Sequence, residues 1–241
     1  MEISVIIPMY NEHRVIEATA KTLAEYMSGR FSSYEILFSD DGSNDGSGDL
    51  VRALNLPSVR VIGFSENHGK GFAVRKAMME AQGDLLLFTD ADLAYGTEVI
   101  GRIYDFYLEH RQEVQLILGS RKLDKNGYEA YRPIRKVMSK LYLRILGFVG
   151  GFRLSDSQCG CKAFEHRAAN DIFSRCEIDG YAFDFEAILW AQELGYSIAE
   201  IPVKILSHDE SKVRIVRDSY RMLRDLLKIR KKIQKRVETK E

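Results

Sequence analysis

The first 120 residues alternate between short apolar runs and segments with helical spacing. The apolar runs lack polar alternation, which predicts strands covered on both faces, at residues 3–8, 34–39, 59–63, 85–89 and 114–119. Between them, apolar residues interrupt a polar face at helical spacing, which predicts helices over residues 12–27, 45–54, 71–81 and 97–110. Strands that alternate with helices in this way predict βαβ units and therefore a parallel sheet.

The second half of the chain is less regular. Helices are predicted over residues 131–148, 167–173, 182–194 and 214–236, with one strand over 198–203. There is no repeat, low-complexity tract or Pro/Gly-rich linker, so we expect one domain spanning residues 1–241.

Two of the predicted helices are basic and amphipathic. In the helix over 131–148 an apolar stripe lies beside a basic row formed by Lys136, Lys140 and Arg144. In the helix over 214–236 the predicted apolar stripe is Val216, Tyr220, Leu223 and Leu227, flanked by Arg217, Arg221, Arg224, Lys228, Lys231 and Lys235. Each basic residue near an anionic leaflet contributes about 1 kcal/mol. Such helices favour contact with a membrane surface, although a packed helix or a dimer helix has the same pattern.

The amino-acid composition bears on the kind of partner and on the cellular location of the protein. The 241 residues include 35 Lys plus Arg and 35 Asp plus Glu, and this zero net charge argues against a nucleic-acid partner. Three cysteines do not suggest a disulfide framework, which favours the reducing cytosol. We see no signal peptide and no apolar run near the ~20 residues that cross a bilayer. The chain is therefore expected to be soluble or peripheral, and with the basic helices we expect a cytoplasmic protein that is peripheral on the cytoplasmic face of a membrane.

Acidic residues cluster where the first, second and fourth predicted strands end. The clusters occupy residues 8–12, residues 40–45, and the pair Asp90 and Asp92. Ligands bind beyond the carboxyl ends of parallel strands. One Asp-x-Asp alone would be a turn or a helix cap, but three clusters at one sheet edge predict a site. Carboxylate oxygens there suit Mg²⁺ or Mn²⁺.

A glycine-rich segment, residues 67–71, follows the third predicted strand. Its spacing does not fit the Walker pattern, so an ATPase is excluded. The glycines allow close approach of a ligand at the start of the next helix, where Lys70 and Arg75 supply positive charge. A solvated helix start is the alternative interpretation.

Together these motifs resemble the family-2 glycosyltransferases. The resemblance rests on Pro8-x-Tyr10-Asn11-Glu12, Asp40-Asp41-Gly42-Ser43-x-Asp45, Asn67-x-Gly69-Lys70-Gly71 with Arg75, and Asp90-x-Asp92. It continues toward the polyprenyl-phosphate sugar synthases through Gly119-Ser120-Arg121, the segment 156–162, Phe183-Asp184-x-Glu186 and Ser211-Lys212. It implies an α/β fold of GT-A type, with a Rossmann-like, mostly parallel sheet flanked by helices and a C-terminal amphipathic helix.

The resemblance also implies a role for each matching residue. Nucleotide-sugar binding would fall to Pro8, Tyr10, Glu12, Asp41, Lys70, Arg75 and Asp90, and metal binding to Asp90 and Asp92. The catalytic group would comprise Asp92, Arg121, Gln158 and Lys212, with Asp184 or Glu186 as acceptor-side residues or bases. The donor would be bound by about residues 1–120, and the acceptor and membrane by about 121–241.

The expected reaction is inverting hexose transfer from a nucleotide sugar to a polyprenyl or dolichyl phosphate. Residues 157–162 resemble the glucose synthases more than the mannose synthases, so UDP-glucose is favoured and GDP-mannose comes next. Ala94 departs from the mannose-synthase pattern, which has Gln at this position. Two alternatives stay open: a family-2 enzyme acting on a sugar hydroxyl, and an inactive nucleotide-binding subunit. A membrane surface or a membrane partner subunit would complete the system.

Overall fold

The computed structural model describes residues 1–126, 151, 154–206, 222 and 224–233. The helix predicted over 131–148, with Lys136, Lys140 and Arg144, lies outside the described residues. Lys212 also lies outside them, as does most of the segment 207–223. In the part of the chain that is described, no helix is both long enough and apolar enough to cross a membrane.

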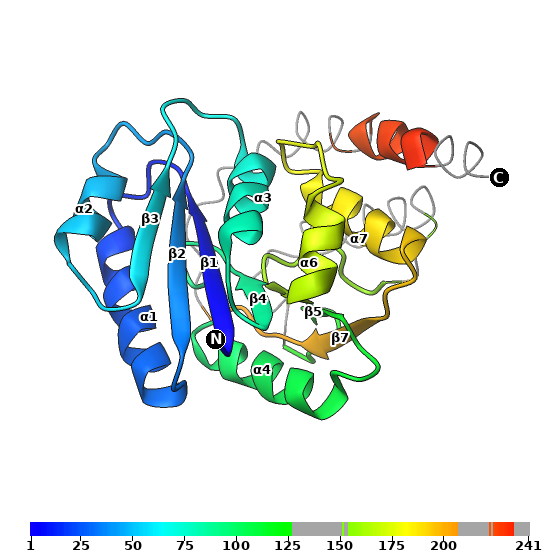
Figure 1. The fold of residues 1–241 in the computed structure, drawn as a ribbon, viewed down its shortest axis with the longest axis horizontal. Helices are drawn as coiled ribbons and strands as arrows, with labels where there is room; N and C mark the ends of the chain where they lie inside the picture. The colour runs from blue at the N-terminus through cyan, green and yellow to red at the C-terminus, as the bar shows by residue number, and fades with distance from the viewer. Residues whose placement is uncertain (127–150, 152–153, 207–221, 223, 234–241) are drawn as a thin grey trace.

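The described residues form a seven-stranded sheet in the order β3-β2-β1-β4-β6-β5-β7 (Figure 1). The strands are β1 (Ile3–Met9), β2 (Tyr34–Asp40), β3 (Val59–Gly63), β4 (Leu85–Phe88), β5 (Leu116–Ser120), β6 (Lys162–Glu165) and β7 (Ile198–Pro202). Strand β6 runs antiparallel to both of its neighbours, and the other neighbouring strands pair in parallel. The predicted mostly parallel sheet is therefore confirmed.

Helices cover both faces of this sheet. They are α1 (Ile16–Arg30), α2 (Ser47–Ala53), α3 (Lys70–Glu80), α4 (Glu98–His110), α6 (His166–Phe173) and α7 (Phe183–Glu193). Residue 222 and residues 224–233 are also helical, and together they are called here the C-terminal helix. One hydrophobic cluster joins the sheet to α3, α6, α7 and the C-terminal helix, and a second joins it to α1, α2 and α4.

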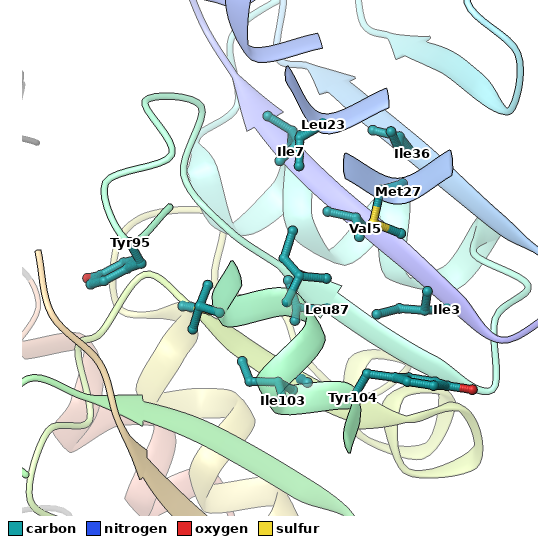
Figure 2. Close-up of a cluster of buried hydrophobic side chains, with 14 of the residues drawn as sticks. Ile3, Val5, Ile7, Leu23, Met27, Ile36, Leu87, Tyr95, Ile103 and Tyr104 are labelled. Carbon is teal, nitrogen blue, oxygen red and sulfur yellow. The ribbon is translucent and has the colours of Figure 1, made fainter. Parts of the chain in front are cut away.

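The two clusters explain why the strands are continuous apolar runs. In β1, Ile6 belongs to the cluster under α3, whereas Val5 and Ile7 belong to the cluster under α1 and α4. Successive side chains of a strand point to opposite faces, so a sheet covered twice needs apolar residues at consecutive positions. Figure 2 shows the second cluster, to which β1, α1 (Leu23 and Met27) and α4 (Ile103 and Tyr104) all contribute side chains.

Strand register aligns the carboxyl ends at one edge of the sheet. Met9, the last residue of β1, is opposite Asp40, the last residue of β2, and Asp40 is opposite Gly63 of β3. Strand β4 pairs Phe88 with Ile6, so its following loop emerges at the same edge. The acidic clusters after these strands therefore share one edge, as predicted.

Strand β6 was not predicted, and it is the reversed strand of the sheet. Its first residue, Lys162, pairs with Phe88 of β4 and with Leu118 of β5. Because β6 is antiparallel, the segment that precedes it reaches the edge where β4 ends. The reversal thus delivers residues 156–161 to the acidic clusters.

The described part of the C-terminal helix buries a different stripe from the predicted one. Leu227, predicted to be in the apolar stripe, is 47% exposed. The buried residues are Met222, Leu226, Ile229 and Ile233, which pack in the cluster under α3, α6 and α7. The stripe prediction was therefore wrong at Leu227, because two neighbouring stripes of this helix carry apolar residues and only one meets the core.

Replacing leucine at adjacent positions of this helix tests the correction. Leu226→Ala is expected to lower the free energy of unfolding by about 2–5 kcal/mol, because its side chain is fully buried. The matched control Leu227→Ala is expected to change it by about 0.5 kcal/mol or less. Urea unfolding followed by circular dichroism measures both, and equal losses would contradict the described packing.

Candidate active site

The loop after β1 is fastened to the loop after β2 by hydroxyl groups. The backbone N–H of Asn11 donates to Ser43 Oγ (2.9 Å), and that of Glu12 donates to Ser47 Oγ (2.9 Å). Tyr10, just before them, is 38% exposed. The serines of the second acidic cluster therefore hold the first loop in place and leave the Tyr10 ring accessible at the sheet edge.

Pro8 and Asp41 flank this loop but are both buried. Pro8 lies within β1, in a strand whose residues are all buried. The carboxylate of Asp41 accepts hydrogen bonds from His68 N (3.0 Å), Gly69 N (2.7 Å) and Asn67 Nδ2 (2.8 Å). Burial raises the pKa of Asp41, although these donors oppose the shift. Asp41 thus fixes the glycine-rich segment in front of α3.

The centre of the site is an ion pair between Lys70 Nζ and Asp90 Oδ1. The two side chains are 27% and 34% exposed, so they lie at the surface of the edge. Burial opposes the charge on Lys70, but Asp90 outweighs it and raises the pKa of Lys70. In the same loop Asp92 Oδ1 accepts from Ala94 N (3.1 Å) around Leu93, whose φ of 47° is left-handed.

The residues around Asp90 fit a divalent cation bound together with a diphosphate. A Cβ atom at Gly160 would lie only 2.0 Å from Asp90 Oδ2, so glycine keeps the space beside this carboxylate open. Asp90 and Asp92 offer hard oxygen ligands, and Mg²⁺ characteristically takes one or two carboxylates plus phosphate oxygens. Among the described residues no cluster of three metal-ligating side chains occurs.

A second charged pair lies behind the first. Lys162 Nζ donates to Asp184 Oδ1 (2.7 Å) and to the carbonyl of Cys159 (2.6 Å), and Lys162 is fully buried. Burial raises the pKa of Asp184, while Lys162 and Lys70 both oppose the rise. Asp90, Lys70, Asp184 and Lys162 therefore form a row of alternating charge, called here the charge row. Sequence analysis named the first three but assigned no role to Lys162.

Arg121 is held by a buried carboxylate that sequence analysis did not identify. Its Nε and Nη2 donate to the two oxygens of Asp156 (2.6 and 2.8 Å), and its backbone N donates to Oδ2 (3.1 Å). Asp156 is fully buried, yet Arg121 overcomes the effect of burial and lowers the pKa of Asp156. The Asp156 loop is in turn fixed by Glu200, which accepts from Ser155 N and Asp156 N. The catalytic role expected for Arg121 stays a prediction.

Gln158 lies beside the C-terminal helix. Its Nε2 is 3.7 Å from the sulfur of Met222, a weak hydrogen bond. The segment 156–161 is therefore bordered by β4 on one side and by the C-terminal helix on the other.

Two predicted site residues, Arg75 and Glu186, contact the loop between α6 and α7 (residues 174–182). Arg75 Nη2 donates to Asp179 Oδ1 (2.7 Å). Glu186 Oε2 accepts from the backbone N–H groups of Glu177 (2.8 Å) and Ile178 (2.7 Å). Burial raises the pKa of Glu186, and these donors oppose the rise. Their roles as donor-binding residue and base stay predictions; what the structure shows is that both hold this loop.

The pair of Arg121 and Asp156 leads to a stability prediction. Arg121→Ala is expected to lower the free energy of unfolding by about 3–5 kcal/mol, because it leaves a buried carboxylate uncompensated. The double variant with Asp156→Ala should lose less than the sum of the single variants, and the exposed neighbour control Lys122→Ala should change little. Denaturant unfolding of the wild type, the two single variants and the double variant measures the coupling; strictly additive losses would refute it.

Solved structures share this architecture. Glucosyl-3-phosphoglycerate synthase from Mycobacterium tuberculosis, in complex with Mn²⁺, UDP and glucosyl-3-phosphoglycerate, matches with a TM-score of 0.70 at 19% identity. The match covers 94% of this chain and 78% of that one. Mannosyl-3-phosphoglycerate synthase from Rubrobacter xylanophilus matches with a TM-score of 0.68 at 19% identity, over 100% of this chain and 76% of the other. At this identity the likeness concerns the fold, which is that of the GT-A glycosyltransferases.

Proteins with similar sequences match this chain over most of its length. A dolichyl-phosphate beta-glucosyltransferase of Saccharomyces cerevisiae is 30% identical over 95% of this chain and 74% of its own length. One of Dictyostelium discoideum is 29% identical over 95% of this chain and 73% of its own. The model of glycosyl transferase family 2 matches residues 4–173, which include β1 to β6 and all three acidic clusters. This chain therefore belongs to glycosyl transferase family 2 and is a glycosyltransferase.

Proposed function

We propose that the chain transfers glucose from UDP-glucose to a polyprenyl phosphate of the dolichyl type, with inversion at the anomeric carbon. The observation that carries the proposal is the accessible ion pair of Asp90 and Lys70, which lies at the sheet edge where ligands bind, with Asp92 on the same loop as Asp90. Relatives named dolichyl-phosphate beta-glucosyltransferase, aligned over 95% of the chain, support the choice of substrates. GDP-mannose is the second candidate donor.

The donor would lie along the edge from β1 to β4. Tyr10 offers an exposed ring for the base, and the loop fixed by Asp41 borders the nucleoside. Asp90 and Asp92 would hold Mg²⁺ or Mn²⁺, which supplies positive charge to the departing diphosphate. Lys70 adds a fixed positive charge at the same place. In this scheme about residues 1–120 bind the donor and about 121–241 serve the acceptor, within one domain.

A phosphate acceptor needs positioning more than it needs a base. The second pKa of a phosphomonoester is about 6, so at neutral pH its oxygen is already an anionic nucleophile. That oxygen attacks the anomeric carbon while the bond to the diphosphate breaks, and UDP leaves with the electron pair. The chain's task is to align the two groups and to compensate the charge that the leaving diphosphate gains.

A sugar hydroxyl as acceptor is the second candidate, and one observation favours it. Burial raises the pKa of Asp184, which moves this carboxyl toward the range of a general base. Asp184 also lies in the charge row beside Lys70, close to where the donor would react. A hydroxyl acceptor would need this residue to take its proton, whereas a phosphate acceptor would not.

The assay that decides between these functions combines two donors with one variant. Radiolabelled UDP-glucose and GDP-mannose are each offered with polyprenyl phosphate and, in parallel, with a free oligosaccharide, and the label in lipid and in oligosaccharide is measured. Asp92→Ala is expected to reduce lipid labelling by about 10²-fold or more, because charge compensation at the leaving group is lost. The control Glu109→Ala, on a side chain that is 77% exposed, should retain full activity. Full activity of Asp92→Ala, or activity in excess chelator, would refute the metal role; labelling of a sugar but never of lipid would favour the second candidate.

We further propose that the protein works at the membrane surface, where such a lipid resides. The outward face of the C-terminal helix carries the exposed residues Arg224, Leu227, Lys228 and Lys231. Basic side chains around one exposed leucine suit an anionic leaflet. A cytoplasmic location agrees with the three cysteines, all buried and free.

Reversing three charges on this helix tests the membrane proposal. Changing Arg224, Lys228 and Lys231 to Glu is expected to weaken co-sedimentation with anionic liposomes by at least tenfold, from about 1 kcal/mol per residue. Binding of the wild type should also fall with salt, since the Debye length is already ~8 Å at physiological strength. The control reverses Lys21, Arg52 and Arg111, which are exposed on other elements and give the same change in net charge. Equal weakening by both sets would show that only net charge matters, and no binding by the wild type would favour a membrane partner subunit.

A further inference from the structure

The loop between α6 and α7 (residues 174–182) is anchored at several points to the elements around it. Glu186 of α7 accepts two of its backbone N–H groups, at Glu177 and Ile178. The side chain of Glu177 forms an ion pair with Lys232 of the C-terminal helix. In Figure 1 this loop lies at the same end of the molecule as the loops after β1, β2 and β3.

The same loop caps the start of α3, immediately beside Lys70. The carbonyl of Asp179 accepts from Gly71 N (2.8 Å) and Phe72 N (3.2 Å), and the carboxylate of Asp179 pairs with Arg75 one turn further along. The first N–H groups of a helix have no partner within the helix. Here protein backbone satisfies two of them, so the glycine-rich segment meets this loop.

The glycines of that segment are required by the contact. A Cβ atom at Gly69 would lie 2.4 Å from the carbonyl oxygen of Asp179, and one at Gly71 would lie 2.4 Å from that of Ile178. Both positions flank Lys70. The loop is thus held against the residue that pairs with Asp90, and its position relative to the charge row is fixed.

Gly180 and Tyr181 lie at the end of this anchored loop. A Cβ atom at Gly180 would meet nothing within 4 Å, and Tyr181 is 37% exposed, although Phe183 two residues later is buried. Tyr181 lies three residues before Asp184 of the charge row, just ahead of α7. A large aromatic ring is therefore held accessible near the charge row by an anchored loop.

We propose that Tyr181 contacts the hexose ring of the nucleotide sugar and so helps to determine donor specificity. This inference rests on the proposed function, because it takes the ligand to be a nucleotide sugar. An aromatic side chain offers an apolar face to the C–H groups of a sugar and a hydroxyl group to its oxygens.

The order of elements along the sheet edge assigns the sugar to Tyr181 and not the base. The nucleoside side is at β1 and β2, where Tyr10 is exposed. The diphosphate side is at the end of β4, with Asp90 and Lys70. Beyond β4 in the same direction lies β6, with the start of α7 beside it. Helix α7 carries Asp184 and begins two residues after Tyr181. A sugar attached to the far phosphate extends toward this side.

Binding of a sugar nucleotide and of the same nucleotide without its sugar separates the possible roles. Titration calorimetry compares UDP-glucose with UDP, and GDP-mannose with GDP, in the presence of Mn²⁺. Tyr181→Ala is expected to weaken the preferred sugar nucleotide by about 3–10-fold while leaving the bare nucleoside diphosphate within about twofold. Tyr181→Phe keeps the ring and should retain most of the affinity. Tyr10→Ala should weaken both ligands alike, and Met79→Ala, on an exposed residue of α3, should change neither.

The other possible outcomes contradict either the sugar contact of Tyr181 or the proposed function. If Tyr181→Ala binds the sugar nucleotide as tightly as the wild type, Tyr181 does not contact the sugar and the proposed function is unaffected. Equal weakening of both ligands means that Tyr181 only supports the loop, and a thermal melt shows whether the fold itself has changed. A wild type that binds neither sugar nucleotide overturns the proposed function, and this inference with it.

Discussion

Compensation of buried charge at one edge of the sheet is the constraint on which the site depends. Asp90, Lys70, Asp184 and Lys162 alternate in sign, and Lys162 has no exposed surface at all. A buried ion whose partner is removed destabilises a fold by about 3–5 kcal/mol. Each member of the charge row comes from a different element: the loop after β4 and the starts of α3, α7 and β6. The fold must therefore bring two element ends together to form each ion pair, and all four to complete the charge row.

The reversal of β6 makes this arrangement possible. In a parallel strand, the first residue lies at the edge opposite the ligands. Because β6 is antiparallel, its first residue Lys162 lies beside Phe88 at the end of β4, and Gly160 comes against Asp90. The sequence could not reveal this strand, since it has only four residues and begins with a lysine that looks like a surface residue. Its partner Asp184 lies 22 positions later, so the pairing has no local signal.

The sequence predicts well those features that depend on neighbouring residues in the chain. Continuous apolar runs identified β1 to β5, and the acidic clusters follow those strands directly, so their common edge followed from the parallel topology alone. Which polar side chains face a ligand and which hold another loop is decided by distant partners. Arg75 contacts Asp179, 104 positions away, and Glu186 holds backbone that precedes it. The prediction that Leu227 is buried was wrong for a similar reason. The spacing of apolar residues along the helix allows two apolar stripes, and only the position of the core determines which one is buried.

The charge row also bears on the choice between a phosphate and a hydroxyl acceptor. Its two lysines and two aspartates cancel, and Asp92 adds one negative charge, which a divalent cation would turn into a net positive site. Without Lys70 and Lys162 the carboxylates would repel an anionic acceptor as well as the diphosphate. Two unit charges 4 Å apart interact with about 4 kcal/mol where the effective dielectric constant is about 20. A neutral hydroxyl would not need this compensation, since the donor diphosphate is already served by the metal and Lys70. Lys162, which no solvent reaches, donates to Asp184. Because this bond stabilises the charged carboxylate, it makes Asp184 a weaker base, which favours the proposed phosphate acceptor over a hydroxyl.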